Sequence, residues 1–179
     1  LFLALALAEN GHPKEAKEIL AKSDLDRAAP AEWSMAARVY KALGNIAEAK
    51  KWVTKMRGYA FVDGSYAHWY AQGWSGEEEN TAFCFEAMAL VSPEDPLIEK
   101  VVAYMLGRRQ YDGWSSTYCT GATLDAMGAY MRYHKSSLGS GKIDVIVNGE
   151  NLRTVTIDKQ SLFDENYRLR VPASRLKWG

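Results

Sequence analysis

The chain has 179 residues, of which 47% are hydrophobic and 12% aromatic, enough to fill the core of one large domain or of one domain and part of another. Its 22 basic and 22 acidic side chains give a formal net charge of zero. Binding to nucleic acid relies on a basic surplus gathered in a patch, so this balance argues against a nucleic-acid partner.

The first ten residues, LFLALALAEN, are apolar over only about eight positions, too few to span a membrane. They have no charged region before them and no small-residue cleavage site, so they predict no signal peptide. The leucines alternate as in a strand, but the alanines between them favour a helix, which Asn10-Gly11 would end. Because the pattern starts midway and without methionine, we expect the chain to be a piece of a longer protein.

A repeat with a period of 33 residues links the first four predicted helices. Gly11-His12-Pro13-Lys14-Glu15-Ala16-Lys17 matches Gly44-Asn45-Ile46-Ala47-Glu48-Ala49-Lys50. An antiparallel helix hairpin requires a small residue at the turn and alanine where the two helices approach each other closely. The period is that of tetratricopeptide arrays, although the pattern ends after residue 57. Helices are expected over 14–22, from Pro30 to the turn at Gly44, and over 46–56.

A second repeat lies further along the chain. Gly73-Trp74-Ser75 and Gly113-Trp114-Ser115 each precede a segment rich in threonine, alanine, cysteine and methionine at helical spacing. The aromatic, glycine-containing stretch 59–74 predicts a loop with a short pair of strands. Helices are expected over 77–90, from the Asp95-Pro96 start to Leu106, and over 117–134.

The character of the sequence changes at Ser136. The stretch SSLGSGK predicts a flexible linker over 136–141, after which alternating apolar residues on either side of Asn148-Gly149 predict a β-hairpin. Residues 167–171 predict a third strand. We therefore divide the chain into a helical domain, 1–135, incomplete at its N-terminus, and an incomplete antiparallel β module, 142–179.

Helix hairpins joined by Gly-Trp-Ser loops favour a mainly α fold: a partial α/α toroid followed by the small antiparallel β module. Tryptophan supplies a large apolar wedge with one N–H that needs a partner, and glycine lets the loop pass close to its neighbour. Small residues in the following helix would let the inner helices crowd together. The loop is therefore interpreted as a corner of the toroid.

Residues 112–131, DGWSSTYCTGATLDAMGAYM, resemble the last helical repeat of the thioester-containing domain in the alpha-2-macroglobulin family. There a G-W-x-S-T-x-x-T loop precedes an alanine-rich helix that ends in tyrosine. The hairpins of residues 1–57 are reminiscent of bacterial members, and the strands from 142 fit the β domain that follows the toroid. The matching residues of the structural motif are Gly113, Trp114, Ser116, Thr117 and Thr120, with Gly73 and Trp74 in the earlier copy.

This resemblance implies an endopeptidase inhibitor, not an enzyme: a large periplasmic, cell-surface or extracellular protein whose partners are proteinases. Cleavage of a bait region would cage the attacking proteinase. In many members a Cys-x-Glu-Gln thioester then couples to it covalently. The nearest match here is Cys84-Phe85-Glu86-Ala87, in which Ala87 stands where the glutamine acyl group is needed. We therefore expect no thioester within these residues.

The sequence gives little support to other chemistry. His12, His68 and His134 are scattered and form no metal-binding motif, so no catalytic, cofactor or metal residue is assigned. Asp63 and His68 with Ser65 or Ser75 are close in sequence, which does not predict triad geometry. Cys84 and Cys119 are expected as buried thiols, with a bridge left open.

Two alternatives remain for the function. A helical-repeat, tetratricopeptide-like scaffold for protein interaction would explain the 33-residue repeat, but not the later loops or the β module. A toroid enzyme resembling terpene cyclases or prenyltransferases would need an Asp-rich motif or zinc ligands, and the sequence contains neither.

Overall fold

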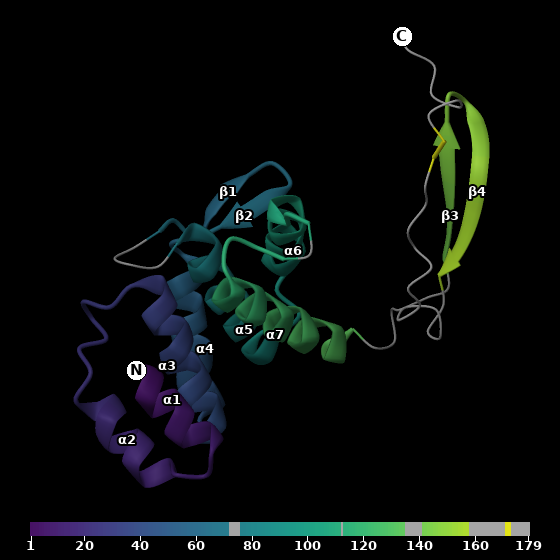
Figure 1. The fold of residues 1–179 in the computed structure, drawn as a ribbon. Helices are drawn as coiled ribbons and strands as arrows, with labels where there is room; N and C mark the ends of the chain where they lie inside the picture. Colours follow the sequence, from purple (N-terminus) through teal and green to yellow (C-terminus); the bar gives the residue numbers. More distant parts are fainter. Residues whose placement is uncertain (72–75, 112, 135–140, 158–170, 173–179) are drawn as a thin grey trace. The chain divides into compact units, whose positions relative to one another are not determined.

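The computed structural model describes residues 1–71, 76–111, 113–134, 141–157 and 171–172 (Figure 1). The chain divides into two compact units, Leu1–Tyr133 and His134–Gly179. The described part is mainly helical, with small antiparallel sheets, as the sequence predicts. Its helices are α1 (Phe2–Glu9), α2 (Pro13–Ala21), α3 (Pro30–Ala42), α4 (Ile46–Arg57), α5 (Glu77–Val91), α6 (Leu97–Arg108) and α7 (Thr117–Tyr133), and its strands are β1 (Phe61–Asp63), β2 (Tyr66–His68), β3 (Gly141–Val147) and β4 (Glu150–Ile157).

The helices of the first unit form two layers. The odd-numbered helices make a row in which α1 packs on α3, α3 on α5, and α5 on α7. The even-numbered helices cover this row: α2 packs on α1, α4 on α3 and α5, and α6 on α5. Figure 1 shows α5 and α7 side by side within the row. Each helix is therefore followed by one in the other layer, as expected of successive antiparallel hairpins.

The two N-terminal hairpins share one turn geometry. Gly11 and Gly44 have φ angles of +81° and +78°, a left-handed conformation that only glycine adopts without strain. The residue after each glycine donates its N–H to the carbonyl five positions earlier, which closes the preceding helix. These bonds are His12 N to Leu7 O, 2.9 Å, and Asn45 N to Tyr40 O, 2.8 Å. The predicted 33-residue repeat is thus a repeat of structure.

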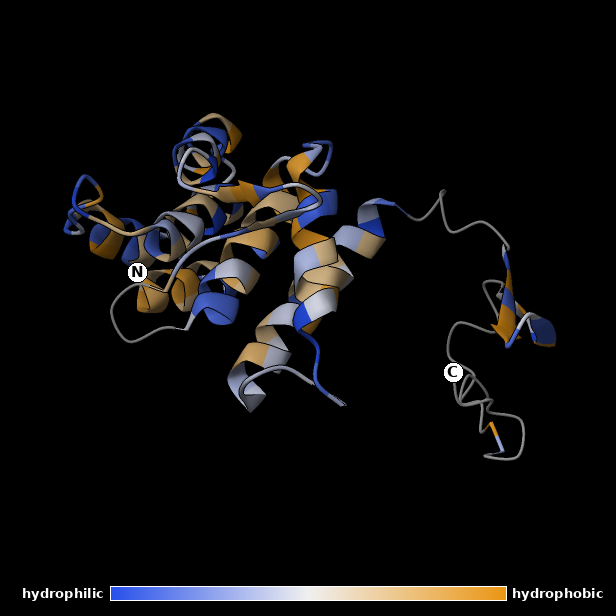
Figure 2. Ribbon diagram, turned by 90° about the horizontal axis from the view of Figure 1, so that it is seen from above, coloured by the Kyte–Doolittle hydropathy of each residue, from blue (hydrophilic) through white to orange (hydrophobic). Residues whose placement is uncertain are grey.

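Helix α5 lies at the centre of the first unit. Because α3, α4, α6, α7 and β2 all pack on it, it is buried on nearly every side. Even polar residues within it, among them Thr81 and Glu86, are buried. Figure 2 shows that the helices carry hydrophobic and hydrophilic residues together. The largest side chains with less than 2% exposure include Phe85 and Met88 of α5, Met56 of α4, and Trp69, which lies between β2 and α5.

The predicted strand pairs are present. β1 pairs with β2 between Phe61 and His68, within the stretch expected to form a loop with short strands. In the second unit β3 pairs with β4 through Asn148-Gly149, whose φ angles of +53° and +84° are those of a type I′ turn. The register shifts after Val145, so the hairpin contains a bulge that the alternation did not predict.

Parts of the predicted linker and of the predicted third strand lie outside the described residues. These parts are 136–140 of the linker and 167–170 of the strand. Gly141, placed in the linker by the sequence, already belongs to β3. Among the described helices, none combines the length and the apolar character that crossing a membrane requires.

Candidate functional site

The loop before α7 is built around Trp114. Its backbone N–H donates to Thr120 Oγ1 (3.0 Å), and its indole Nε1–H donates to the carbonyl oxygen of Met105 (2.7 Å). Met105 is in the last turn of α6, where carbonyls lack partners within the helix. A Cβ on Gly113 would lie 2.7 Å from Thr120 Oγ1, so this position needs glycine. Trp114 is partly buried against the core, less than the corner interpretation predicts.

Trp69 repeats this arrangement ahead of α5. Its backbone N–H donates to Thr81 Oγ1 (3.1 Å), and its Nε1–H donates to the carbonyl of Met56 (2.8 Å), in the last turn of α4. Trp69 is only 1% exposed. Within the described residues the structural counterpart of Trp114 is therefore Trp69. Gly73, Trp74 and Ser75, which the sequence paired with the second loop, lie outside the described residues.

The threonine contacts set the alignment of the two helices at 39 residues. Thr81 corresponds to Thr120, and TAFCFEAM in α5 corresponds to TGATLDAM in α7. Cys84 then matches Thr123, so the two cysteines do not occupy equivalent positions in α5 and α7. Both thiols are buried and free, as expected. Burial raises the pKa of Cys84 well above its usual value, which keeps this thiol protonated.

Two carboxylates at the start of α5 hold the loop that precedes α7. Glu78 Oε2 accepts from the Ser115 N–H (3.1 Å), and Glu79 Oε1 accepts from the Ser116 hydroxyl (3.0 Å). Ser116 Oγ in turn accepts from the Cys119 N–H (3.0 Å), which caps the first turn of α7. Of the predicted motif, Ser116 and Thr120 therefore have direct structural contacts, and Thr117 begins the helix.

His68 contacts Glu77 and Tyr104. Its Nε2 lies 3.7 Å from Glu77 Oε1, and its ring stacks on that of Tyr104 at 4.6 Å. The Tyr104 hydroxyl donates to the same carboxylate. The pKa of Tyr104 is raised mainly by burial and, to a smaller extent, by this hydrogen bond. No hydrogen bond or ion pair joins Asp63 or Ser65 to His68, and Ser75 lies outside the described residues. The described residues also contain no cluster able to hold a metal ion.

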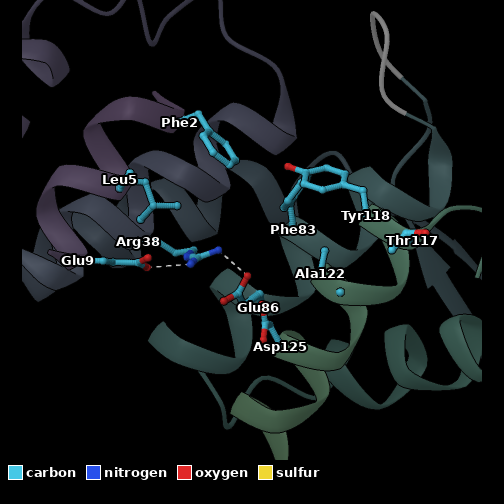
Figure 3. Close-up of a pocket in the computed structure, with 12 residues that line it drawn as sticks. Phe2, Leu5, Glu9, Arg38, Phe83, Glu86, Thr117, Tyr118, Ala122 and Asp125 are labelled. Carbon is cyan, nitrogen blue, oxygen red and sulfur yellow. Dashed lines mark hydrogen bonds and ion pairs between the residues drawn. The ribbon is translucent and has the colours of Figure 1, made fainter. Parts of the chain in front are cut away.

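A pocket of about 350 Å³ opens on the row of odd-numbered helices, and all its lining residues come from α1, α3, α5 and α7 (Figure 3). We call it the row pocket. Phe2 and Leu5 from α1 face Phe83 and Tyr118 from α5 and α7, whose ring centroids are 5.6 Å apart. Charged residues form its other end. The row pocket thus has one apolar and one charged part.

The charged part is organised by Arg38, whose side chain is 14% exposed. Its Nη2 donates to Glu9 Oε1 (2.7 Å) and its Nη1 donates to Glu86 Oε2, so the guanidinium joins α1, α3 and α5 (Figure 3). Burial raises the pKa of Glu86, Arg38 lowers it, and Asp125 and Glu9 raise it further. Asp125 lies beside this group, and within the described residues it has no hydrogen bond or ion pair.

No protein-family model matches the chain, and its sequence matches no curated protein.

The sequence predicted the second tryptophan loop but not the row pocket or the roles of Trp69 and Arg38. Aligning the threonines, 39 residues apart, would place the counterpart of Trp114 at position 75, so the sequence does not point to Trp69. Nothing in the local pattern distinguishes Arg38, because its partners are 29 and 48 residues away.

Proposed function

We propose that this chain is part of an alpha-2-macroglobulin-like proteinase-trapping inhibitor, and that its first unit is an arc of an α/α toroid. The observation that carries the proposal is a repeated corner at Trp69 and Trp114. In each, the indole N–H donates to a carbonyl in the last turn of one helix, and the backbone N–H of the tryptophan donates to a threonine hydroxyl in the next helix. The second corner belongs to the segment that resembles the thioester-containing domain.

The two-layer arrangement supports the same reading. In an α/α toroid, inner helices form a ring and outer helices cover it. The odd-numbered row would be the inner ring, since α1, α3, α5 and α7 pack in succession and share one pocket. The tryptophan corners would fix the angle between each outer helix and the next inner one.

In this proposal the helical unit contributes shape and contact surface, not covalent chemistry. Cys84 is fully buried in the middle of α5, and Ala87 lacks the acyl group that a thioester ring needs. Treatment of the intact protein with methylamine should leave the mass of any peptide containing Cys84 unchanged. The proteinase would be held by caging, in the periplasm, at the cell surface or outside the cell, by a protein that is itself no enzyme.

The test compares two substrates of one proteinase. The intact protein is incubated with a trypsin-like proteinase, and hydrolysis of a small chromogenic peptide and of a large protein substrate is then measured. A trap abolishes activity on the large substrate and leaves activity on the small one. Proteinase whose active site has been blocked beforehand is the control and should not be retained. Equal inhibition of both substrates, or of neither, would contradict the proposal.

A second candidate is the helical-repeat interaction scaffold, favoured by the matching turns at Gly11 and Gly44. Ala16 and Ala49, also 33 residues apart, are both fully buried where their hairpins close. A scaffold would bind its partner whether or not it had been cleaved. Retention of the active-site-blocked proteinase as strongly as of the active form would therefore favour this candidate over the trap.

A further inference from the structure

We propose that the row pocket binds a ligand that carries an ammonium or guanidinium group on an apolar stem. This inference does not depend on the proteinase-trapping proposal, since it uses only the residues that line the pocket. Its volume of about 350 Å³ is at the lower end of the range of small-molecule sites. A single amine of modest size, or one long basic side chain, fits that volume.

The apolar end of the pocket offers surface that a stem can cover. Phe2 and Tyr118 are 59% and 42% exposed, although both lie beside the buried residues Leu5 and Phe83. In Figure 3 these side chains stand on opposite sides of the opening, on α1 and on α7. An aliphatic or aromatic stem between them would remove apolar surface of both from water. A cation near the Tyr118 ring would also gain from the ring's negative face.

The charged end offers an anion for the head group. Three carboxylates, of Glu9, Glu86 and Asp125, line the pocket against one guanidinium. Both terminal nitrogens of Arg38 are already bonded, to Glu9 and Glu86. Asp125, the remaining carboxylate, is exposed and unpaired among the described residues, so it is the group to which an incoming cation would bind.

The neighbouring charges favour a cation over an anion at this point. Lys41 and Arg132 line an adjoining hollow together with Arg38, and neither lines the row pocket. Beside Asp125 an anion would meet carboxylates, because both terminal nitrogens of Arg38 are bonded to Glu9 and Glu86 and its unpaired Nε is buried. Burial is the main cause of the raised pKa of Glu86, and repulsion from Asp125 and Glu9 adds to it, so a bound positive charge would relieve that repulsion.

Two sources could supply this chemistry: a free amine, or a lysine or arginine side chain of a polypeptide. Ligand-observed NMR titrations of the intact protein separate them, with phenethylammonium as one probe and the capped dipeptide acetyl-Phe-Lys-amide as the other. Binding of the free amine alone assigns a small-molecule site, and tighter binding of the dipeptide assigns a side-chain site. 2-Phenylethanol and 3-phenylpropionate serve as neutral and anionic analogues of matched shape.

The cationic probes should bind more tightly than the alcohol, and the carboxylate should not bind. Asp125→Asn should weaken cation binding about two- to fivefold, the range of a partly exposed ion pair, and leave the alcohol unaffected. Asp63→Asn, which removes an exposed carboxylate on β1, is the matched control and should change nothing. Tyr118→Ala should weaken both the cation and the alcohol. The proposal is overturned if no cation binds, if alcohol and ammonium bind alike, or if Asp125→Asn binds the ammonium as wild type does.

Discussion

The indole N–H of Trp114 is bonded to the carbonyl oxygen of Met105 over 2.7 Å, so a side chain from the loop ahead of α7 closes the end of α6. The carbonyls in the last turn of a helix must find partners outside it, and here the partner also determines where the chain turns next. The same bond joins Trp69 to Met56 over 2.8 Å. The connections from α4 to α5 and from α6 to α7 are therefore stabilised by the same kind of hydrogen bond.

Replacing Trp114 with phenylalanine separates the hydrogen bond from the packing. Trp114→Phe keeps most of the apolar contact but leaves the Met105 carbonyl without its partner, so we expect a loss of about 1 kcal/mol in the free energy of unfolding. Trp114→Ala should cost more, about 2–3 kcal/mol, below the range for fully buried aromatic residues because Trp114 is only partly buried. Urea denaturation of the intact protein followed by circular dichroism measures both. An undiminished free energy of unfolding for Trp114→Phe would contradict a separate role for the indole N–H.

The two threonines that hold the tryptophan backbones provide an internal comparison. Thr81 is fully buried and Thr120 is not. Valine at either position keeps the shape of the side chain but removes the hydroxyl that accepts from the tryptophan backbone N–H. At Trp114 this N–H can bond to water instead, whereas at Trp69 it is buried. We expect a loss of about 2 kcal/mol for Thr81→Val and of less than about 1 kcal/mol for Thr120→Val, by the same denaturation measurement. A larger loss at Thr120 would show that burial does not decide the cost.

The helices could be predicted from the sequence because their signals are local. Glycine after an apolar run, proline at a first turn and the 33-residue repeat placed α1 to α4 within one or two residues of their bounds. The tryptophan corner could be predicted only once. From Trp114 to its threonine is six residues, and from Trp69 it is twelve. This unequal spacing hides the relation from any comparison that aligns Gly-Trp-Ser with Gly-Trp-Ser.

The row pocket could not be predicted for a different reason. Arg38 belongs to α3 by its spacing, and nothing in that helix shows that its charge faces Glu86 of α5. The contact depends on how three helices pack together. A hydrophobic pattern predicts which face of each helix is buried, but not which residues of another helix that face meets. Glu86 was considered for the thioester motif alone, yet its surroundings make it part of the charged end of the pocket.

The matching glycine turns predict matching costs of substitution. Gly11 and Gly44 both have φ near +80°, and a Cβ at either would meet no atom within 4 Å. The cost of alanine is therefore backbone strain alone, about 1–2 kcal/mol at each site. Gly121→Ala is the control: it lies within α7 with open space around it and should stabilise the protein by about 0.5–1 kcal/mol. Thermal unfolding measures all three, and unequal losses at Gly11 and Gly44 would contradict structural equivalence of the two hairpins.

Glu86 predicts a distinctive dependence of stability on pH. Its pKa is raised in the folded protein, chiefly by burial, from an ordinary value of 4.5. Between these two pKa values the folded state binds more protons than the unfolded state, so this carboxyl makes the protein less stable as the pH rises. Glu86→Gln keeps an acceptor for Arg38 and removes the titration. The free energy of unfolding of wild type minus that of the variant should therefore fall as the pH rises above about 4.5 and level off beyond the raised pKa. Glu18→Gln, at an exposed position on α2, is the control, and its difference from wild type should stay flat. A wild-type advantage that grows with pH would mean that the attraction of Arg38 outweighs burial, and would reverse the assignment.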